Sequence, residues 1–127
     1  MSIEAARGED TVVTILIVDD HPSFRATARA LLEAEGFDVV GEAEDGASAL
    51  RAAAELSPDV VLLDVQLPDV DGFEVARRLT GNGRGPAVVL VSSRDCADFG
   101  PLVGRSGARG FIAKAELSGA ALTALLR

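Results

Sequence analysis

Three short runs of almost uninterrupted apolar residues constrain the fold of this chain most strongly. They span residues 12–18 (VVTILIV), 60–65 (VVLLDV) and 87–91 (AVVLV), and each is followed by polar residues. Runs of this length, rich in Val, Ile and Leu, are typical of central strands covered on both faces of a parallel sheet. Weaker runs at 37–43 and 109–113 complete a prediction of five strands. All are far shorter than a membrane-spanning helix.

Helical patterns lie between the predicted strands. The clearest covers residues 22–35, where Pro22 suits a first helical turn and Gly36 a helix end. Its inward positions are predicted to be Phe24, Ala28, Leu31 and Leu32. Strand and helix alternate along the whole chain, which predicts an α/β fold with a parallel sheet and helices on both faces.

Three further helices and one weak helix follow from the same pattern. We predict helices at 47–56 with Leu50 and Ala54 on one face, at 73–79, and at 117–126 with Leu122, Leu125 and Leu126 inward. Residues 98–106 contain Gly100, Pro101 and Gly104, so we expect only a short or irregular helix there.

Length and composition limit the classes of function. A chain of 127 residues fits one domain, which we place at residues 11–127 behind a flexible tail at 1–10. The net charge of −8 argues against direct binding to nucleic acid or to an anionic membrane. One cysteine, Cys96, and one histidine are too few for a disulfide or a zinc site. The N-terminus lacks a signal peptide, so we expect a cytoplasmic protein.

Polar residues that can carry chemistry follow four of the strands. The first strand leads into Asp19 and Asp20, the third reaches Asp64, the fourth is followed by Ser92, and the fifth by Lys114. Carboxyl ends of parallel strands meet at one edge of a sheet, where function collects. Three clustered carboxylates need a positive charge to offset them, and Mg²⁺ prefers oxygen ligands together with phosphate oxygens. The pattern therefore predicts a site for Mg²⁺ and a phosphoryl group, with Asp64 as the acceptor.

Each of these residues also has a plainer interpretation. Asp19 and Asp20 could cap the helix that starts near Pro22, and Lys114 could be a solvated surface residue. Ser93 could take the place of Ser92. His21 is expected to begin the helix beside the acidic pocket, although a role as a ligand stays open.

The runs ILIVDDHPSFR, VVLLDVQLPDVDG, VLVSS and GARGFIAK, in this order, resemble response-regulator receiver domains. The resemblance extends from about residue 11 to the end and is greatest to the subfamily that usually carries a C-terminal helix-turn-helix. It implies a flavodoxin-like three-layer α/β/α sandwich with a five-stranded parallel sheet in the order 2-1-3-4-5. No helix-turn-helix follows in this sequence, so we expect either a stand-alone receiver or an excised domain.

The resemblance also implies roles for individual residues. Asp64 is the phosphoacceptor, and Mg²⁺ lies on Asp20, Asp64 and the backbone carbonyl of Gln66, with Asp19 assisting through water. Ser92 and Lys114 match the hydroxyl and the lysine of the family. Phe111, which could also be only a core residue, matches the aromatic switch that moves together with Ser92.

The family also implies partners. These are a sensor histidine kinase or phosphotransfer protein, and a downstream protein that reads the face formed by the fourth helix, the fifth strand and the fifth helix. A phosphorylation-linked homodimer is possible, and the chain is not expected to be an enzyme. The sequence departs from the family at Ala115, where proline is usual, and Gln66 and Arg94 occupy positions that tune the phosphoryl lifetime.

Three other functions remain open at this stage. A phosphorylation-independent pseudo-receiver could serve only for docking, although the acids and the lysine are all present. An aspartyl-phosphate phosphatase needs an acid where Gln66 stands. A flavin-binding protein shares only the fold, and the acidic loop after the first strand does not suit a phosphate.

Overall fold

A computed structural model of the chain describes residues 12–93 and 99–127. The expected tail at 1–10, Arg94 and Cys96 lie outside the described residues. Five parallel strands form one sheet in the order β2-β1-β3-β4-β5, which confirms the predicted fold and strand order. The strands are β1 (Thr14–Val18), β2 (Asp38–Ala43), β3 (Val60–Asp64), β4 (Ala87–Ser92) and β5 (Gly110–Ala113).

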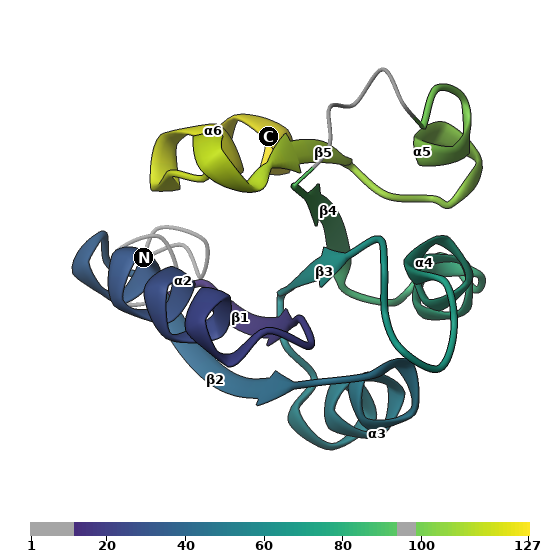
Figure 1. Ribbon diagram of the computed structural model, residues 1–127, viewed down its shortest axis with the longest axis horizontal. Helices are drawn as coiled ribbons and strands as arrows, with labels where there is room; N and C mark the ends of the chain where they lie inside the picture. The colour runs from purple at the N-terminus through teal and green to yellow at the C-terminus, as the bar shows by residue number, and fades with distance from the viewer. Residues whose placement is uncertain (1–11, 94–98) are drawn as a thin grey trace, which may run out of the picture.

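Helices cover both faces of the sheet, and Figure 1 shows the two groups on opposite sides of the strands. The helices are α2 (Pro22–Ala34), α3 (Gly46–Leu56), α4 (Gly72–Thr80), α5 (Leu102–Arg105) and α6 (Gly119–Leu126), with the short 3-10 helix η2 (Lys114–Glu116) before α6. Alternate residues of each strand point to opposite faces. Ile15 and Ile17 therefore pack with α2 and α6, whereas Leu16 and Val18 pack with α3, α4 and α5.

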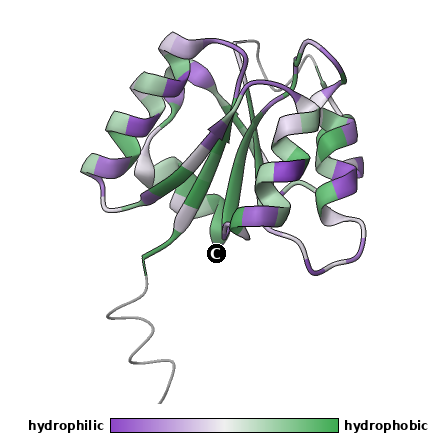
Figure 2. Ribbon diagram, turned by 90° about the horizontal axis from the view of Figure 1, so that it is seen from below, coloured by the Kyte–Doolittle hydropathy of each residue, from purple (hydrophilic) through white to green (hydrophobic). Residues whose placement is uncertain are grey.

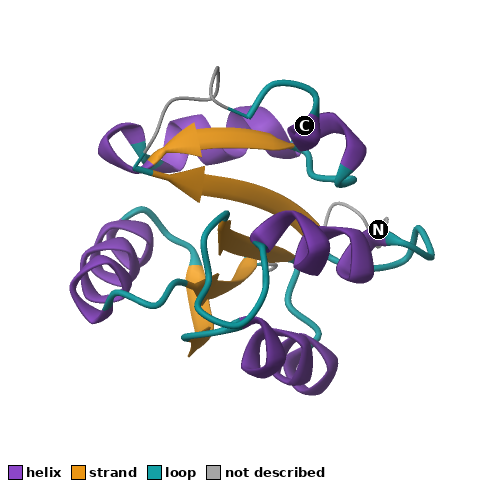
Figure 3. Cartoon of the chain, turned by 45° about the vertical axis from the view of Figure 1, so that its right-hand side comes forward, coloured by secondary structure: helices purple, strands orange, loops and turns teal. Residues whose placement is uncertain are grey.

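The core is built almost entirely from aliphatic side chains. Every residue of β3 is buried, as expected for a strand in the middle of a sheet between two helical layers. Figure 2 shows the apolar strands between helices whose outer faces are hydrophilic, and Figure 3 shows the strands as a layer between the helices. Among the described residues, no helix is long and apolar enough to cross a membrane.

Several predicted boundaries and one helical face were wrong. The first strand starts at Thr14 rather than at residue 12, because the Asp59 carboxylate accepts the Thr14 N–H at 2.9 Å and Val12 is 49% exposed. On α3 the buried side is formed by Ala49 and Ala53, whereas Ala54 is exposed. The helix packs onto the sheet through these small side chains, and Leu50 is only partly buried beside them.

The chain is least regular before and after β5. The weak helix expected at 98–106 is reduced to the four residues of α5, and residues 94–98 are not described. The predicted helix at 117–126 starts at Gly119. Ser118 is its N-cap: the backbone of Ser118 is extended, and its hydroxyl accepts the Ala121 N–H. The other boundaries differ from the prediction by at most one residue, a normal uncertainty at the ends of helices and strands.

Candidate functional site

The register of the sheet brings the first and third strand ends together. Val18 of β1 is paired with Leu63 of β3, so the next residues, Asp19 and Asp64, lie side by side. The Asp19 side chain is completely buried, and Asp64 is only 3% exposed. The Asp19 N–H donates to the Ala43 carbonyl at 3.0 Å, which fixes the start of the loop after β1. Two carboxylates that the sequence separates by 45 positions thus share one buried edge.

The backbone around Asp64 is tightly packed. The Gln66 N–H donates to Asp64 Oδ1 at 3.0 Å, which orients the carboxylate. Gly72, the first residue of α4, lies so close that an added Cβ would be 2.2 Å from the Asp64 carbonyl oxygen. The loop between Asp64 and α4 can fold back over the strand end only because this position has no side chain.

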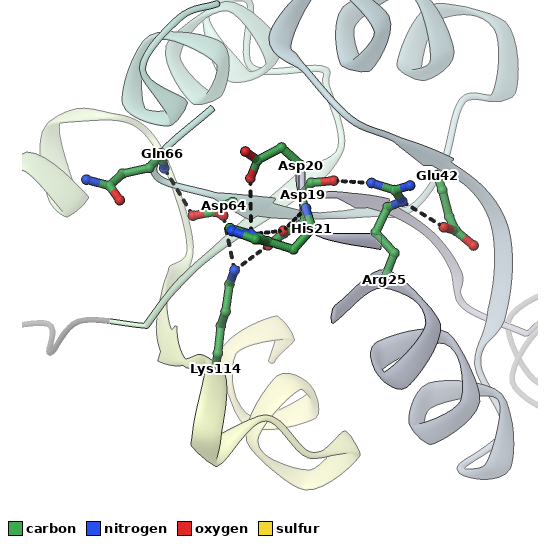
Figure 4. Close-up of polar contacts among 8 residues, drawn as sticks. All are labelled: Asp19, Asp20, His21, Arg25, Glu42, Asp64, Gln66 and Lys114. Carbon is green, nitrogen blue, oxygen red and sulfur yellow. Dashed lines mark hydrogen bonds and ion pairs between the residues drawn. The ribbon is translucent and has the colours of Figure 1, made fainter. Parts of the chain in front are cut away.

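Lys114 supplies the positive charge at this edge. Its Nζ atom lies 2.5 Å from Asp19 Oδ2 and 3.1 Å from Asp64 Oδ2 (Figure 4). It also lies 4.5 Å from the centre of the Phe24 ring, within the range of a cation–π interaction. Lys114 is therefore not a solvated surface residue, because its ammonium group bridges two buried acids and is backed by an aromatic ring.

The shifts in pKa show how crowded the acids are. Burial, and then the neighbouring Asp19 carboxylate, raise the pKa of Asp64 to about 6, although the Gln66 N–H acts against them. Burial also acts to raise the pKa of Asp19. The Lys114 ammonium and the hydrogen bonds from His21 outweigh that effect, so the pKa of Asp19 is lowered. The contacts with Lys114 and His21 therefore outweigh burial at Asp19, whereas burial prevails at Asp64.

Four residues place oxygen or nitrogen atoms where one metal ion could contact them all. One ligand atom each from Asp19, Asp20, His21 and Asp64 lies within 4.8 Å of the others. His21 Nδ1 is 2.9 Å from Asp19 Oδ1 and 3.1 Å from Asp20 Oδ1, although its side chain is 64% exposed (Figure 4). This donor set, dominated by carboxylates and short of positive charge, fits a hard divalent cation such as Mg²⁺.

The helix-capping interpretation of the two acids does not hold for Asp20. His21 is the N-cap of α2 and makes no side-chain capping bond, and the His21 N–H donates to Asp19 rather than to Asp20, at 2.8 Å. Ser92 ends β4 in a buried position, whereas Ser93 is exposed. In the sheet Ser92 is paired with Ala113, the residue before Lys114, so it belongs to the same edge.

Comparison with known proteins agrees with this geometry. A family model described as the response regulator receiver domain matches residues 15–127. The chain belongs to the response-regulator receiver-domain family. A transcriptional regulator of Pseudomonas aeruginosa is 43% identical over 102 residues, which cover 80% of this chain and 49% of that protein. The receiver domain of the response regulator NarL from Mycobacterium tuberculosis matches with a TM-score of 0.79 and 36% identity, covering 91% of this chain and 97% of that one.

Part of this chain is also similar to a segment of an enzyme. A protein-glutamate methylesterase/protein-glutamine glutaminase of Myxococcus xanthus is 48% identical over 82 residues, which cover 64% of this chain and 24% of the enzyme. The receiver domain described here spans about half the length of the transcriptional regulator that it matches. Receiver domains of this family thus occur in larger proteins with different outputs.

Phe111 in this receiver domain is half-buried in a row of three aromatic rings. Its ring centre is 5.6 Å from that of Phe99, which in turn lies 5.5 Å from Phe73 at the start of α4. The row runs from β5 past α5 to α4, on the face of the sheet opposite to α2. Phe111 is therefore in contact with the core and is also within reach of the surface.

Sequence reasoning missed two residues that support the receiver site. The Arg25 guanidinium donates to the Asp19 carbonyl oxygen at 2.6 Å and to Glu42 Oε1 at 3.0 Å (Figure 4). The only sequence signal was a basic residue on the first helix and an acidic residue on the second strand. That signal does not reveal the contact between Arg25 and Glu42, which lie 17 positions apart in the sequence.

Proposed function

We propose that this receiver domain accepts a phosphoryl group on Asp64 in a reaction that depends on Mg²⁺. The observation that carries the proposal is the contact of the Lys114 ammonium with both buried carboxylates, next to a third carboxylate at Asp20. This arrangement offers a nucleophilic oxygen, a fixed positive charge and a set of hard ligands at one edge of the sheet. Phosphoryl transfer needs charge neutralisation and positioning more than it needs covalent help.

In the proposed reaction an Asp64 carboxylate oxygen attacks the phosphorus of a phosphohistidine. The new O–P bond forms an acyl phosphate while the P–N bond breaks and its electron pair goes to the ring nitrogen, so a phosphohistidine protonated on its other ring nitrogen leaves as neutral imidazole. Lys114 pairs with a phosphoryl oxygen of the product, and the Ser92 hydroxyl donates to another. The Gln66 N–H holds the Asp64 carboxylate in position for the attack.

Asp19, Asp20, Asp64 and the backbone carbonyl of Gln66 would hold the Mg²⁺ ion. When bound there, Mg²⁺ would offset the charge of the acids and of the incoming phosphoryl oxygens. The close approach of the Asp19, Asp20 and Asp64 carboxylates supports this part of the proposal, because a divalent cation would offset their combined charge. His21 lies next to this set and is a further candidate ligand.

Phosphorylation is proposed to act through Ser92 and Phe111. Movement of the Ser92 hydroxyl towards the phosphoryl group frees space, into which Phe111 turns, and the face formed by α5, β5 and α6 then changes its partners. The partners are a histidine kinase or phosphotransfer protein and a downstream protein, with a phosphorylation-linked homodimer as one form of output. We propose a cytoplasmic location, as expected from the sequence. We also propose that the chain is a phosphoacceptor and not an enzyme that turns over a separate substrate.

Intact-protein mass spectrometry tests the acceptor. After incubation with acetyl phosphate and Mg²⁺, the wild-type chain should gain a base-labile adduct of about 80 Da, the mass of a phosphoryl group. Asp64→Asn should gain none. Asp38→Asn, the same chemical change at an exposed strand start, should behave as wild type. An adduct that persists in Asp64→Asn would remove Asp64 from the proposal.

Beryllofluoride with Mg²⁺, followed by NMR, tests the switch. We expect amide shifts first at Asp20, Gln66 and Ser92 and then at Phe111 and α6. Shifts confined to the loops around Asp64 would leave phosphorylation without its proposed output. Equal binding of a downstream partner by wild type and by Asp64→Ala would instead favour a docking module that does not need phosphorylation.

A further inference from the structure

The backbone and carboxylate groups of Asp19 each make a hydrogen bond or an ion pair. Its N–H donates to the Ala43 carbonyl, and its carboxylate contacts Lys114 and His21. Its carbonyl oxygen accepts the 2.6 Å hydrogen bond from Arg25 Nη1. Within 12–93 and 99–127, Arg25 is the one side chain that bonds this carbonyl. Arg25 therefore fixes the peptide between the two acids that follow β1.

The Arg25 guanidinium is itself held in place. Glu42, near the end of β2, accepts Arg25 Nε on one carboxylate oxygen and Arg29 Nε on the other, at 3.0 and 2.7 Å. Hydrogen bonds from Arg29 and Arg25 outweigh burial and lower the pKa of Glu42, so the carboxylate is charged at neutral pH. Because Glu42 holds Nε, the Nη1 atom of Arg25 is directed at Asp19.

Arg29 shares the ion pair but not the contact with the site. Its other hydrogen bonds go to Glu33 and to the Val39 carbonyl, away from the loop after β1. Arg25 and Arg29 lie one helical turn apart on α2, and both pair with Glu42. They differ in the bond to Asp19, which makes Arg29 a matched control.

We propose that Arg25 is a positioning residue for the metal site: its guanidinium, oriented by Glu42, fixes the Asp19 backbone and thereby sets where the Asp19 and Asp20 carboxylates lie. The inference rests on the proposed function, since it assigns a support to the same metal site. Groups that orient metal ligands typically change metal affinity by about 10-fold to 100-fold when they are removed. Arg25 also lines an open polar depression of about 340 Å³, so that shortening its side chain leaves no closed void.

The test compares Arg25→Ala, Arg25→Lys and Arg29→Ala with the wild-type chain. Mg²⁺ is titrated while the Asp20 and Gln66 amides are followed by NMR, and metal-free unfolding is measured in parallel. We expect both Arg25 variants to bind Mg²⁺ about 10-fold more weakly. Arg29→Ala should bind Mg²⁺ with the affinity of the wild type, although it also loses an ion pair with Glu42. Arg25→Lys keeps the charge but lacks the two separate donors, Nε and Nη1, that bond Glu42 and Asp19 in a fixed geometry. Full rescue by lysine would therefore overturn positioning in favour of charge alone.

A metal-free measurement separates this inference from the proposed function. The His21 N–H donates to Asp19 Oδ1 at 2.8 Å, so its hydrogen exchange reports how firmly Asp19 is placed. We expect exchange at His21 to become several-fold faster in Arg25→Ala and to stay unchanged in Arg29→Ala. Equal exchange and equal Mg²⁺ affinity in the two alanine variants would overturn the inference. If the wild-type chain binds no Mg²⁺, the proposed metal site fails, and the exchange comparison still decides whether Arg25 places Asp19.

Discussion

The Nζ atom of Lys114 lies 2.5 Å from Oδ2 of Asp19, a carboxylate that water does not reach. Lys114 is the only lysine in the sequence, and it also contacts Asp64. Its ammonium thus lies between two of the acids that are proposed to bind the metal. The lysine and a divalent cation would offset the same negative charges, so removal of the lysine should change both the stability of the chain and its affinity for Mg²⁺.

Replacing Lys114 with Gln should destabilise the ion-free chain and strengthen Mg²⁺ binding. The variant leaves two buried carboxylates without their cation, which should cost about 3 kcal/mol of unfolding free energy at pH 7.5. Mg²⁺ should restore more stability to the variant than it adds to wild type, because it no longer meets a competing charge. Arg109→Gln, the same loss of charge at an exposed position, should show neither effect in Mg²⁺-dependent thermal unfolding. Weaker Mg²⁺ binding by Lys114→Gln would contradict this prediction.

The raised pKa of Asp64 predicts a pH dependence of stability. Its folded-state pKa of about 6 lies above the ordinary value of 3.8, so protonated Asp64 favours the folded state. This contribution is complete below pH 3.8 and is lost as the pH rises through about 6. Metal-free Asp64→Asn should therefore become more stable than wild type between pH 4 and 7, by on the order of 2 kcal/mol. Urea unfolding across this range measures the difference, and a constant difference at all pH values would show that Asp64 does not titrate there.

Gly72 should tolerate no side chain. An added Cβ would lie 2.2 Å from the Asp64 carbonyl oxygen and 2.7 Å from Val65 Cα, and both contacts are with backbone that can move only if the strand end moves. Gly72→Ala should cost about 2 to 3 kcal/mol and slow phosphorylation of Asp64. Gly104→Ala, where an added Cβ meets nothing within 4 Å, serves as the control. Equal unfolding free energies for the two variants would argue against close packing at Asp64.

The ring of Phe24 should stabilise Lys114 through its π face. The ammonium lies 4.5 Å from the ring centre, where a partly desolvated cation–π contact is worth about 1 kcal/mol. A double-mutant cycle with Phe24→Leu and Lys114→Gln isolates this energy from the loss of packing. We expect a favourable coupling near that value. Strict additivity of the two variants in chemical unfolding would show that the ring contributes only packing.

Local patterns in the sequence determined the fold and most of the candidate site. Apolar runs with the length and composition of buried strands, separated by helical patterns, predicted the parallel sheet. The rule that strand ends meet at one edge then brought Asp19, Asp20, Asp64 and Lys114 together before any distance was known. This worked because burial on both faces of a strand imposes a continuous apolar run, a signal carried by neighbouring residues.

Only the tertiary structure decided features that depend on distance and burial between remote segments. The reach of Arg25 to the Asp19 carbonyl and the contact of Phe24 with Lys114 have no local signature, because they arise from how α2 packs on the sheet. The burial that raises the pKa of Asp64 is likewise a property of the assembled layers. Sequence periodicity encodes which face of a segment turns inward. Which atoms meet there, and how far water is excluded, is set by the packing of the whole domain.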